Sequence, residues 1–320
     1  MNSTPHHLVT LTPAPSWDIT YSLTQLDPGL VHRAQTTTRE FAGKGVNVSR
    51  ALALAGISAP AVVPLSPADQ AGVAGGPGLV AVDVEAKLRT NATVVESGGQ
   101  TTKINQAASH VSAREWRSLV RRTAELVAGD HGSWVLVSGT IPESGASAAE
   151  RVSTFMDSVG PDTRIAVDTS GEPLTVFARS GRVDLIKPNV SELAGCVGRA
   201  LATLGEVVDA AQEVVGWGVE TVLVSLGSQG FLAVTGEQQF WARSAPVTAV
   251  NTIGAGDASV AGFFRSLLSG SLSLADSVAT AAAWGALKVT QPGSQLRTLE
   301  PLPTVSVSEQ IQADQPVTSD

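Results

Sequence analysis

The chain has 320 residues, 43% of them hydrophobic and 16% charged, and its formal net charge is −8. A disordered chain would be poorer in apolar residues and richer in charge, so we expect a compact globular protein. An acidic chain is poorly suited to the phosphate backbone of nucleic acids, which argues against nucleic acid as its main partner.

Two regions in the first third of the chain, residues 17–40 and 86–108, are rich in threonine and other polar residues and predict β-ribbons. In the second region, Thr90–Val95 and Thr101–Asn105 flank the turn Ser97-Gly98-Gly99, a pattern typical of a β-hairpin. We predict that the two regions combine into one small β lid over a larger body.

The rest of the chain alternates short β-branched apolar runs with longer amphipathic stretches. Predicted strands are Val135–Ser138, Arg164–Asp168, Val183–Ile186, Thr221–Ser225 and Phe231–Val234. Predicted helices are Ala113–Ala128, Ala146–Ser158 and Leu204–Trp217. Strands and helices in succession predict a mostly parallel sheet with helices on its faces. Ligands of such sheets bind at the carboxyl ends of the strands, where we expect the functional loops.

These patterns divide the chain into an α/β body, which would bind nucleotide and substrate, and the β lid. The body comprises residues 1–16, 41–85 and 109–308, and the lid comprises residues 17–40 and 86–108. The polar residues 309–320 are expected to form a flexible tail, because chain ends without anchoring contacts commonly fray.

A single cysteine, Cys196, cannot form an internal disulfide, which favours a reducing compartment. The sequence shows no signal-peptide pattern and no uninterrupted apolar run of about 18 residues. We therefore expect a cytoplasmic protein that makes no membrane contact.

The strongest chemical signal is the run Asn251-Thr252-Ile253-Gly254-Ala255-Gly256-Asp257-Ala258-Ser259, which leads into the predicted helix Val260–Leu268. The small residues Gly254, Ala255 and Gly256 allow backbone N–H groups to approach an anion, and the helix N-terminus adds partial positive charge. This arrangement suits the charge on a transferring phosphoryl group. Asp257, in the first helical turn, could take the proton of an attacking hydroxyl.

Two alternatives exist for this run. It could be a glycine turn in which Asp257 only caps a helix. It could also belong to a dinucleotide fold, since Gly254-x-Gly256-x-x-Ser259 approaches that fingerprint and Asp276 follows about 20 residues later. However, Asp276 lies in a sequence that looks like a helix start rather than a strand end. The sequence contains no P-loop and no Gly-x-Ser-x-Gly elbow, and its histidines are too scattered for a zinc site.

Four further segments carry a family resemblance together with this run. They are Thr12–Asp18, Ala42–Arg50, Val167–Gly171 and Lys187–Leu193. In this order they resemble the ribokinase-like PfkB carbohydrate kinases, and the resemblance spans about residues 8–300. It implies a three-layer α/β/α body with a mostly parallel sheet and a small β-sheet lid. The branch that the chain resembles most comprises bacterial 1-phosphofructokinase and tagatose-6-phosphate kinase.

The resemblance implies a sugar phosphate bound between the body and the lid. The residues implied at the sugar phosphate are Asp18, Gly43, Lys44, Asn47, Arg89, Lys103 and Ser138. Lys44, Arg89 and Lys103 are candidates for the phosphate already on the sugar, and arginine suits this role because its planar guanidinium binds two phosphate oxygens at once. From the residues alone, Arg89 and Lys103 remain compatible with exposed surface positions.

The resemblance also implies a site for ATP with Mg²⁺. The residues implied at ATP are Lys187, Asn189, Ser225, Gly227, Gly230, Thr252 and Gly254. Asn189 and Glu192 would hold Mg²⁺ through water, because Mg²⁺ keeps several of its waters. The same pair is compatible with a plain helix cap. Asn251 stands where ribokinase-type members commonly have Asp, and the sequence leaves open whether a monovalent cation binds near this loop.

The predicted function is ATP-dependent phosphorylation of a sugar phosphate, with fructose 1-phosphate converted to fructose 1,6-bisphosphate as the first hypothesis. Tagatose 6-phosphate and fructose 6-phosphate are alternative substrates, and a non-catalytic nucleotide or sugar sensor is an alternative of another class. The chain departs from the family pattern at Ala14, Ala42, Ala107 and Ala108, which could shift its substrate preference. By analogy with the family, the lid would also pair two chains into a homodimer.

Overall fold

The computed structural model describes residues 7–73, 78–142, 145–270 and 273–317, and within these ranges ten strands form a large sheet and four form a small one. The large sheet consists, in spatial order, of β14 (Val305–Ser308), β13 (Gln239–Ser244), β12 (Phe231–Val234), β11 (Thr221–Ser225), β10 (Leu185–Ile186), β9 (Arg164–Asp168), β8 (Trp134–Ser138), β1 (Leu8–Leu11), β4 (Ala61–Leu65) and β5 (Leu79–Asp83). From β5 to β11 the neighbouring strands are parallel, and the remaining pairs are antiparallel. The predicted mostly parallel sheet is therefore confirmed.

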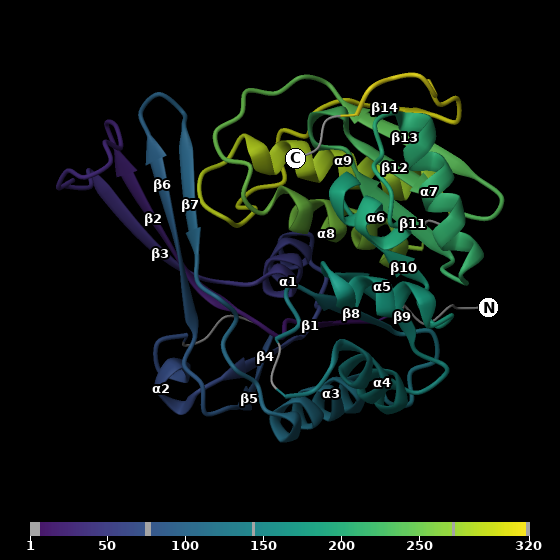
Figure 1. Ribbon diagram of the computed structural model, residues 1–320, viewed down its shortest axis with the longest axis horizontal. Helices are drawn as coiled ribbons and strands as arrows, with labels where there is room; N and C mark the ends of the chain where they lie inside the picture. Colours follow the sequence, from purple (N-terminus) through teal and green to yellow (C-terminus); the bar gives the residue numbers. More distant parts are fainter. Residues whose placement is uncertain (1–6, 74–77, 143–144, 271–272, 318–320) are drawn as a thin grey trace.

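Helices cover both faces of the large sheet (Figure 1). One face carries α3 (Ala113–Val127), α4 (Ala148–Val159), α5 (Glu172–Arg179), α6 (Val190–Val197) and α7 (Leu204–Gly216), and the other carries α1 (Lys44–Leu54), α8 (Ala255–Leu268) and α9 (Leu274–Val289). Strand residues alternate between these two layers: in β8, Val135 and Val137 pack with the first group, whereas Trp134 and Leu136 pack with the second. The expected three-layer α/β/α body is confirmed.

The small sheet stands at one side of the body (Figure 1) and has the order β3 (Thr36–Ala42), β2 (Ser16–Leu23), β6 (Arg89–Glu96) and β7 (Thr101–Asn105). β6 and β7 form the predicted antiparallel hairpin. The base of the sheet packs on the body through Trp17 and Phe41, whose rings meet edge to face with centroids 5.9 Å apart and which share a cluster with Val63. Glu40 of β3 also accepts a hydrogen bond from Arg297 of the body (2.7 Å).

Most predicted elements match the structure within one or two residues, which is the usual uncertainty of element ends. The strand predicted for residues 183–186 is shorter, because only Leu185–Ile186 forms β10. A short helix, α2 (Pro67–Gln70), follows β4. Within the described ranges, no helix is both long and apolar enough to cross a membrane.

The last part of the chain lies against the N-terminus of α7. The N–H groups of Leu204 and Gly205 donate to the carbonyl oxygens of Gln315 (2.8 Å) and Ala313 (2.9 Å). The first N–H groups of a helix have no partner inside the helix, so the docked segment satisfies them. The segment predicted to form a flexible tail, residues 309–320, thus makes specific backbone contacts with the body in the part that the structure describes.

Candidate active site

Charged side chains gather at the carboxyl ends of the parallel strands. Asp168 ends β9 and is buried, and its Oδ1 accepts a hydrogen bond from Nζ of Lys44 at the start of α1 (2.9 Å). The same oxygen forms an ion pair with Nζ of Lys187 after β10 (3.3 Å). Burial alone would raise the pKa of the Asp168 carboxyl, but the two ammonium groups hold it below its ordinary value. Burial alone would lower the pKa of Lys44, but Asp168 and other carboxylates raise it. The cluster lies where parallel sheets bind their ligands.

Asp257 lies beside this cluster, in the first turn of α8, and is only 8% exposed. Its Oδ2 accepts a hydrogen bond from Nδ2 of Asn47 in α1 (2.8 Å). Burial raises the pKa of Asp257 to about 6; Lys44 opposes this rise and Asp168 adds to it. A carboxyl group with this pKa is ionised near neutral pH and is a stronger base than an ordinary aspartate.

The helix that carries Asp257 begins without a side-chain cap. α8 starts after Gly254, whose φ of +79° suits glycine, and a Cβ at this position would collide with the carbonyl oxygen of Ser294. Among the α-helices that the structure describes, α1 and α5 also begin after a glycine without a cap, whereas the others are capped by a Ser, Thr or Asn side chain. The N–H group of Ala255 donates to the carbonyl oxygen of Thr252 (3.2 Å), whereas those of Gly256 and Asp257 donate to no described residue and are available to an anion.

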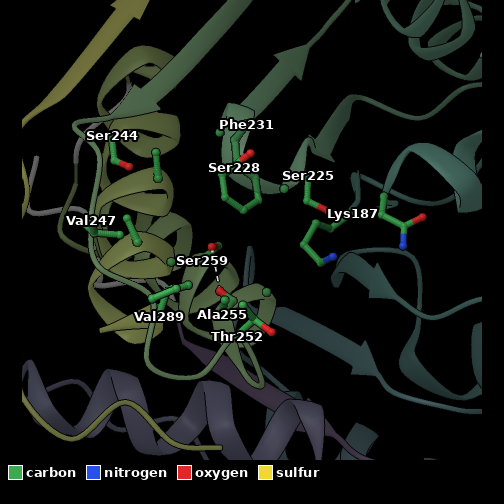
Figure 2. Close-up of a pocket in the computed structure, with 18 of the residues that line it drawn as sticks. Lys187, Ser225, Ser228, Phe231, Ser244, Val247, Thr252, Ala255, Ser259 and Val289 are labelled. Atoms are coloured by element: carbon green, nitrogen blue, oxygen red, sulfur yellow. Dashed lines mark hydrogen bonds between the residues drawn. The ribbon is translucent and has the colours of Figure 1, made fainter. Parts of the chain in front are cut away.

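A pocket of about 830 Å³ adjoins this N-terminus, a size typical of small-molecule sites. Lys187 and Ser225 lie on one side of it, and Val247 and Val289 lie on the other (Figure 2). Its apolar wall is completed by Phe231 and by alanines of α9. An apolar wall and a cationic end beside a helix N-terminus suit a planar base joined to phosphate groups.

Most residues predicted to contact ATP line this pocket. These are Lys187, Asn189, Ser225, Gly227, Gly230 and Thr252. Gly254 is not among the lining residues; it precedes Ala255 and Gly256, which are. A Cβ on Gly256 would lie 3.9 Å from Nζ of Lys187, so the ammonium group is close to the start of α8.

Asn189 and Glu192 form a capping box at the start of α6. Oδ1 of Asn189 accepts from the N–H of Glu192 (2.7 Å), and Oε2 of Glu192 accepts from the N–H of Asn189 (2.9 Å). Both residues also line the pocket, so a capping role does not exclude a role at Mg²⁺. Oε1 of Glu192 accepts no hydrogen bond from the described residues and could face a hydrated Mg²⁺. Within the described ranges, no three His, Cys, Asp or Glu side chains cluster as direct metal ligands.

On the small sheet, two of the residues predicted for the sugar phosphate, Asp18 and Arg89, lie in a second cluster. Oδ1 of Asp18 accepts from Nδ2 of Asn91 (3.0 Å). The guanidinium of Arg89 donates to the carbonyl oxygens of Ala14 (3.1 Å) and Gln106 (3.3 Å), which links the body to the end of β7. Burial lowers the pKa of Arg89, and Asp18 opposes this shift. Arg89 is therefore not an exposed surface cation.

The remaining predicted sugar residues divide into two groups. Ser138 ends β8 beside Asp168 in register, and its buried hydroxyl finds no hydrogen-bond partner in the described part of the chain. Gly43 is the residue before α1, next to Lys44. Lys103, in contrast, is exposed on β7, and its side chain makes no hydrogen bond or ion pair with described residues. The structure thus places Ser138 beside Asp168 and Gly43 beside Lys44, whereas the side chain of Lys103 is exposed away from these charged groups.

Asp168, the loop after β13 and Lys288 are absent from the sequence-based set of site residues. Asp168 carries a signal, because it is a charged residue at the end of a buried parallel strand. Lys288 carries a weaker sequence signal, because it is a charged residue that follows an apolar helical stretch in α9. The structure shows that its side chain is fully buried. The loop that contributes Ser244, Pro246 and Val247 to the pocket has no periodicity or motif that would single it out.

A family model described as "pfkB family carbohydrate kinase" matches residues 13–301. ATP-dependent 6-phosphofructokinase isozyme 2 of Escherichia coli (strain K12) is 33% identical over 302 residues, which cover 90% of this chain and 94% of that protein. A 1-phosphofructokinase of Haloferax volcanii is 33% identical over 267 residues, 80% of this chain and 82% of that protein. A crystal structure of phosphofructokinase-2 from Escherichia coli in complex with potassium has a TM-score of 0.83 at 30% identity, covering 92% of this chain and 96% of the other.

The fold and the site together define a phosphotransferase with an alcohol group as acceptor. The chain belongs to the pfkB family of carbohydrate kinases. The resemblance found in the five sequence segments is thereby confirmed, and so is the ribokinase-like fold, which a ribokinase from Thermotoga maritima shares at 18% identity with a TM-score of 0.68. The dinucleotide alternative is wrong, and Asp276 lies in the first turn of α9 rather than at a strand end.

Proposed function

We propose that this chain transfers the γ-phosphoryl group of ATP to fructose 1-phosphate, which yields fructose 1,6-bisphosphate and ADP. The observation that carries the proposal is the buried Asp257 carboxylate beside the uncapped N-terminus of α8, next to a pocket large enough for a nucleotide. Phosphoryl transfer needs a base for the attacking hydroxyl and donors for the charge on the transferring group at one place.

In the proposed reaction, Asp257 takes the proton of the attacking hydroxyl while that oxygen forms a bond to the γ-phosphorus. The bond from the γ-phosphorus to the bridging oxygen of ADP breaks, and ADP keeps the electron pair. The N–H groups at Gly254–Gly256 stabilise the negative charge on the transferring group. Lys44 and Lys187 add positive charge at the same end of the pocket.

ATP would lie with its base against the apolar wall at Val247 and Val289 and with its phosphates toward Lys187. Asn189 and Glu192 would hold the waters of Mg²⁺, which neutralises phosphate charge when it is bound. These assignments agree with the activity of the Escherichia coli relative, an ATP-dependent 6-phosphofructokinase.

The sugar phosphate would lie between the small sheet and the cluster at Asp257. Asp18 and Asn47 would bind sugar hydroxyls, and Lys44 and Arg89 would bind the phosphate already present. Closure of the small sheet over this site would exclude water and limit the hydrolysis of ATP. Lys103 is the proposed contact that has the least geometric support, because it is exposed on β7.

Fructose 6-phosphate is the second candidate substrate. The 6-phosphofructokinase of Escherichia coli and the 1-phosphofructokinase of Haloferax volcanii are both 33% identical to this chain, but the former covers 90% of it and the latter 80%. The two sugars carry their phosphate at opposite ends, so the positions of Arg89 and Lys44 relative to the attacking hydroxyl would decide between them.

The test is the release of ADP from Mg-ATP with fructose 1-phosphate, fructose 6-phosphate, tagatose 6-phosphate and free fructose in parallel. We expect kcat/KM to be highest for fructose 1-phosphate. A preference for one of the other sugars would keep the kinase mechanism and replace the substrate. Binding of ATP without ADP release with any phosphosugar would instead favour a sensor on the same fold.

We further propose that the small sheet pairs two chains into a homodimer. Leu30 and Val31, in the turn between β2 and β3, and Ile104 of β7 are 67%, 90% and 64% exposed. Large exposed apolar side chains on the small sheet favour a protein interface over solvent. Phosphofructokinase-2 from Escherichia coli has a tetrameric inhibited form, so that relative assembles.

A further inference from the structure

Lys288, in the last turn of α9, is a fully buried cation with 0% exposure. Its Nζ donates to the carbonyl oxygens of Asn251 (3.4 Å) and Gln291 (3.3 Å). The first carbonyl belongs to the loop that leads into α8, and the second belongs to the turn that follows α9. A buried ammonium group is costly unless something compensates for the loss of water, so its retention here indicates a role.

The side chain of Lys288 lies directly behind the phosphoryl-binding N-terminus of α8. Its Cε is 3.6 Å from the position that a Cβ on Gly254 would take. The carbonyl of Ser294 packs against the same glycine. A positive charge at this place adds to the partial positive charge of the helix N-terminus. In the proposed reaction, the transferring phosphoryl group lies on the opposite side of this N-terminus from Lys288.

The loop around the ammonium group is closed by its own hydrogen bonds. Nδ2 of Asn251 donates to the carbonyl oxygen of Gly293 (3.1 Å), and Oδ1 of Asn251 accepts from the N–H of Ile253 (2.9 Å). The N–H of Asn251 donates to the carbonyl oxygen of Val289 (3.0 Å). Carbonyl oxygens that converge on one point, as in this loop, can also coordinate a monovalent cation in place of its hydration water.

Three further charges face Lys288, each from a different element. Glu40 of β3 and Asp257 of α8 favour the ammonium form, whereas Arg297, after α9, opposes it. Glu40 also accepts hydrogen bonds from Arg297 (2.7 Å) and from the N–H of Ser294 (3.3 Å). The small sheet therefore supplies the carboxylate that partly balances the buried lysine.

We propose that the Lys288 ammonium group is a built-in cation, which takes the place of a bound potassium ion and holds the Asn251 and Gln291 carbonyls in the geometry that the α8 N-terminus requires. The sequence leaves open whether a monovalent cation binds near this loop. Such a cation does not fit beside the Lys288 ammonium group, although the structure of a relative from Escherichia coli is in complex with potassium. Lys288 is a positioning residue, because it acts through the loop and not on the substrate. Its effect on turnover rests on the proposed kinase function.

The first experiment needs no variant. Kinase activity of the wild-type protein is measured while potassium replaces tetramethylammonium at constant ionic strength. Because the cation is already part of the chain, we expect no activation. Activation of several-fold by potassium would overturn the proposal.

Two variants then separate charge from packing. Lys288→Met keeps most of the side-chain volume without the charge, and we expect kcat to fall by roughly tenfold to a hundredfold, with a small change in KM and no rescue by potassium. Lys288→Ala leaves room at the position of Nζ, and its kcat should recover with potassium or methylammonium but not with tetramethylammonium. Wild-type kcat in Lys288→Met would show that the charge is irrelevant and would overturn the proposal.

A binding readout keeps this test independent of the proposed function. We expect potassium to raise the melting temperature of Lys288→Ala but not that of the wild-type protein, in the absence of nucleotide and sugar. If no sugar supports turnover, the kinase proposal fails while the melting data still decide the role of Lys288. An unchanged melting temperature of Lys288→Ala in potassium would count against the built-in cation.

The pH dependence gives a further signature. Burial lowers the pKa of Lys288 to about 8, against the opposing effect of Glu40 and Asp257. The ammonium form is therefore lost as the pH rises through about 8, and we expect kcat of the wild-type protein to decline there. In Lys288→Ala with potassium this decline should be absent. If both proteins decline in the same way, the alkaline limb belongs to another group and the assignment to Lys288 is wrong.

Discussion

Asp257 is ionised at neutral pH although burial raises its pKa to about 6. The folded state then holds a proton more tightly than the unfolded state, so the cost of the buried charge is complete above the folded pKa. We expect Asp257→Asn to raise the free energy of unfolding at pH 7.5 by about 1–3 kcal/mol and to lower kcat by about 10²–10⁴-fold. Urea unfolding and ADP release measure the two effects.

The matched control is Asp209→Asn, at an exposed position of α7. Loss of an exposed carboxylate away from the site should change stability by less than about 0.5 kcal/mol and leave activity unchanged. Full activity of Asp257→Asn would remove this residue from the proposed mechanism.

The same pKa sets the acid side of the activity profile. Only the ionised carboxylate can accept a proton, so kcat/KM should fall as the pH is lowered through about 6. The measurement is kcat/KM between pH 5 and pH 8 at saturating Mg-ATP, with unfolding followed in parallel. A flat profile in a folded protein would mean that Asp257 has an ordinary pKa or is not the base.

At the residue scale, the sequence is informative where function depends on neighbours along the chain. Gly254 and Asp257 are predictable because a glycine turn and the helix it starts lie within a few residues of each other. Lys288 is not predictable in the same way, because its carbonyl partners come from Asn251 and Gln291 on two separate loops. All that the sequence shows is that Lys288 is a charged residue at the end of an apolar helical stretch.

The start of α8 after Gly254 shows how a glycine keeps a helix N-terminus accessible to a ligand. At Gly254, a side chain would require both a positive φ and a collision with the Ser294 carbonyl. We expect Gly254→Ala to lower the free energy of unfolding by at least about 2 kcal/mol and kcat by about a hundredfold, because left-handed strain adds to displacement of the donors. Urea unfolding and steady-state kinetics are the measurements.

Gly198→Ala is the matched control for this prediction. Gly198 ends α6 with a φ of +72°, and a Cβ there would meet nothing within 4 Å. It should show the left-handed strain alone, about 1–2 kcal/mol, with normal kcat. Equal loss of stability in the two variants would mean that the approach of Ser294 to α8 is unimportant.

At the element scale, strands and helices are predictable because burial on two faces leaves a period in the sequence. The hairpin β6–β7 is predictable because its turn has a local signal. The position of residues 310–317 is not, because it depends on the unpaired N–H groups of Leu204 and Gly205, which are distant along the chain. Polar composition alone therefore suggests a free tail where the chain is docked.

For the whole molecule, we expect light scattering to give the mass of a dimer at micromolar concentration. The double variant Val31→Asp, Ile104→Lys should give a monomer, because it places charges on the exposed apolar positions of the small sheet. Val307→Asp is the control, since Val307 is also exposed (37%) but lies on β14 at the far edge of the large sheet. A wild-type protein that is monomeric at all concentrations would contradict the proposed pairing.

The small sheet has a consequence for the order of folding. Its central strands β2 and β6 are parallel neighbours, yet Ser16 pairs with Arg89, and strands β3, β4 and β5 and helices α1 and α2 come between them along the chain. Such a contact closes a long loop, and the entropy lost must be compensated by contacts that form later. The outer strands β3 and β7 are largely exposed and bury little surface in return. We therefore expect the small sheet to assemble after the body and to open before it, so that its backbone amide protons exchange while the body stays intact.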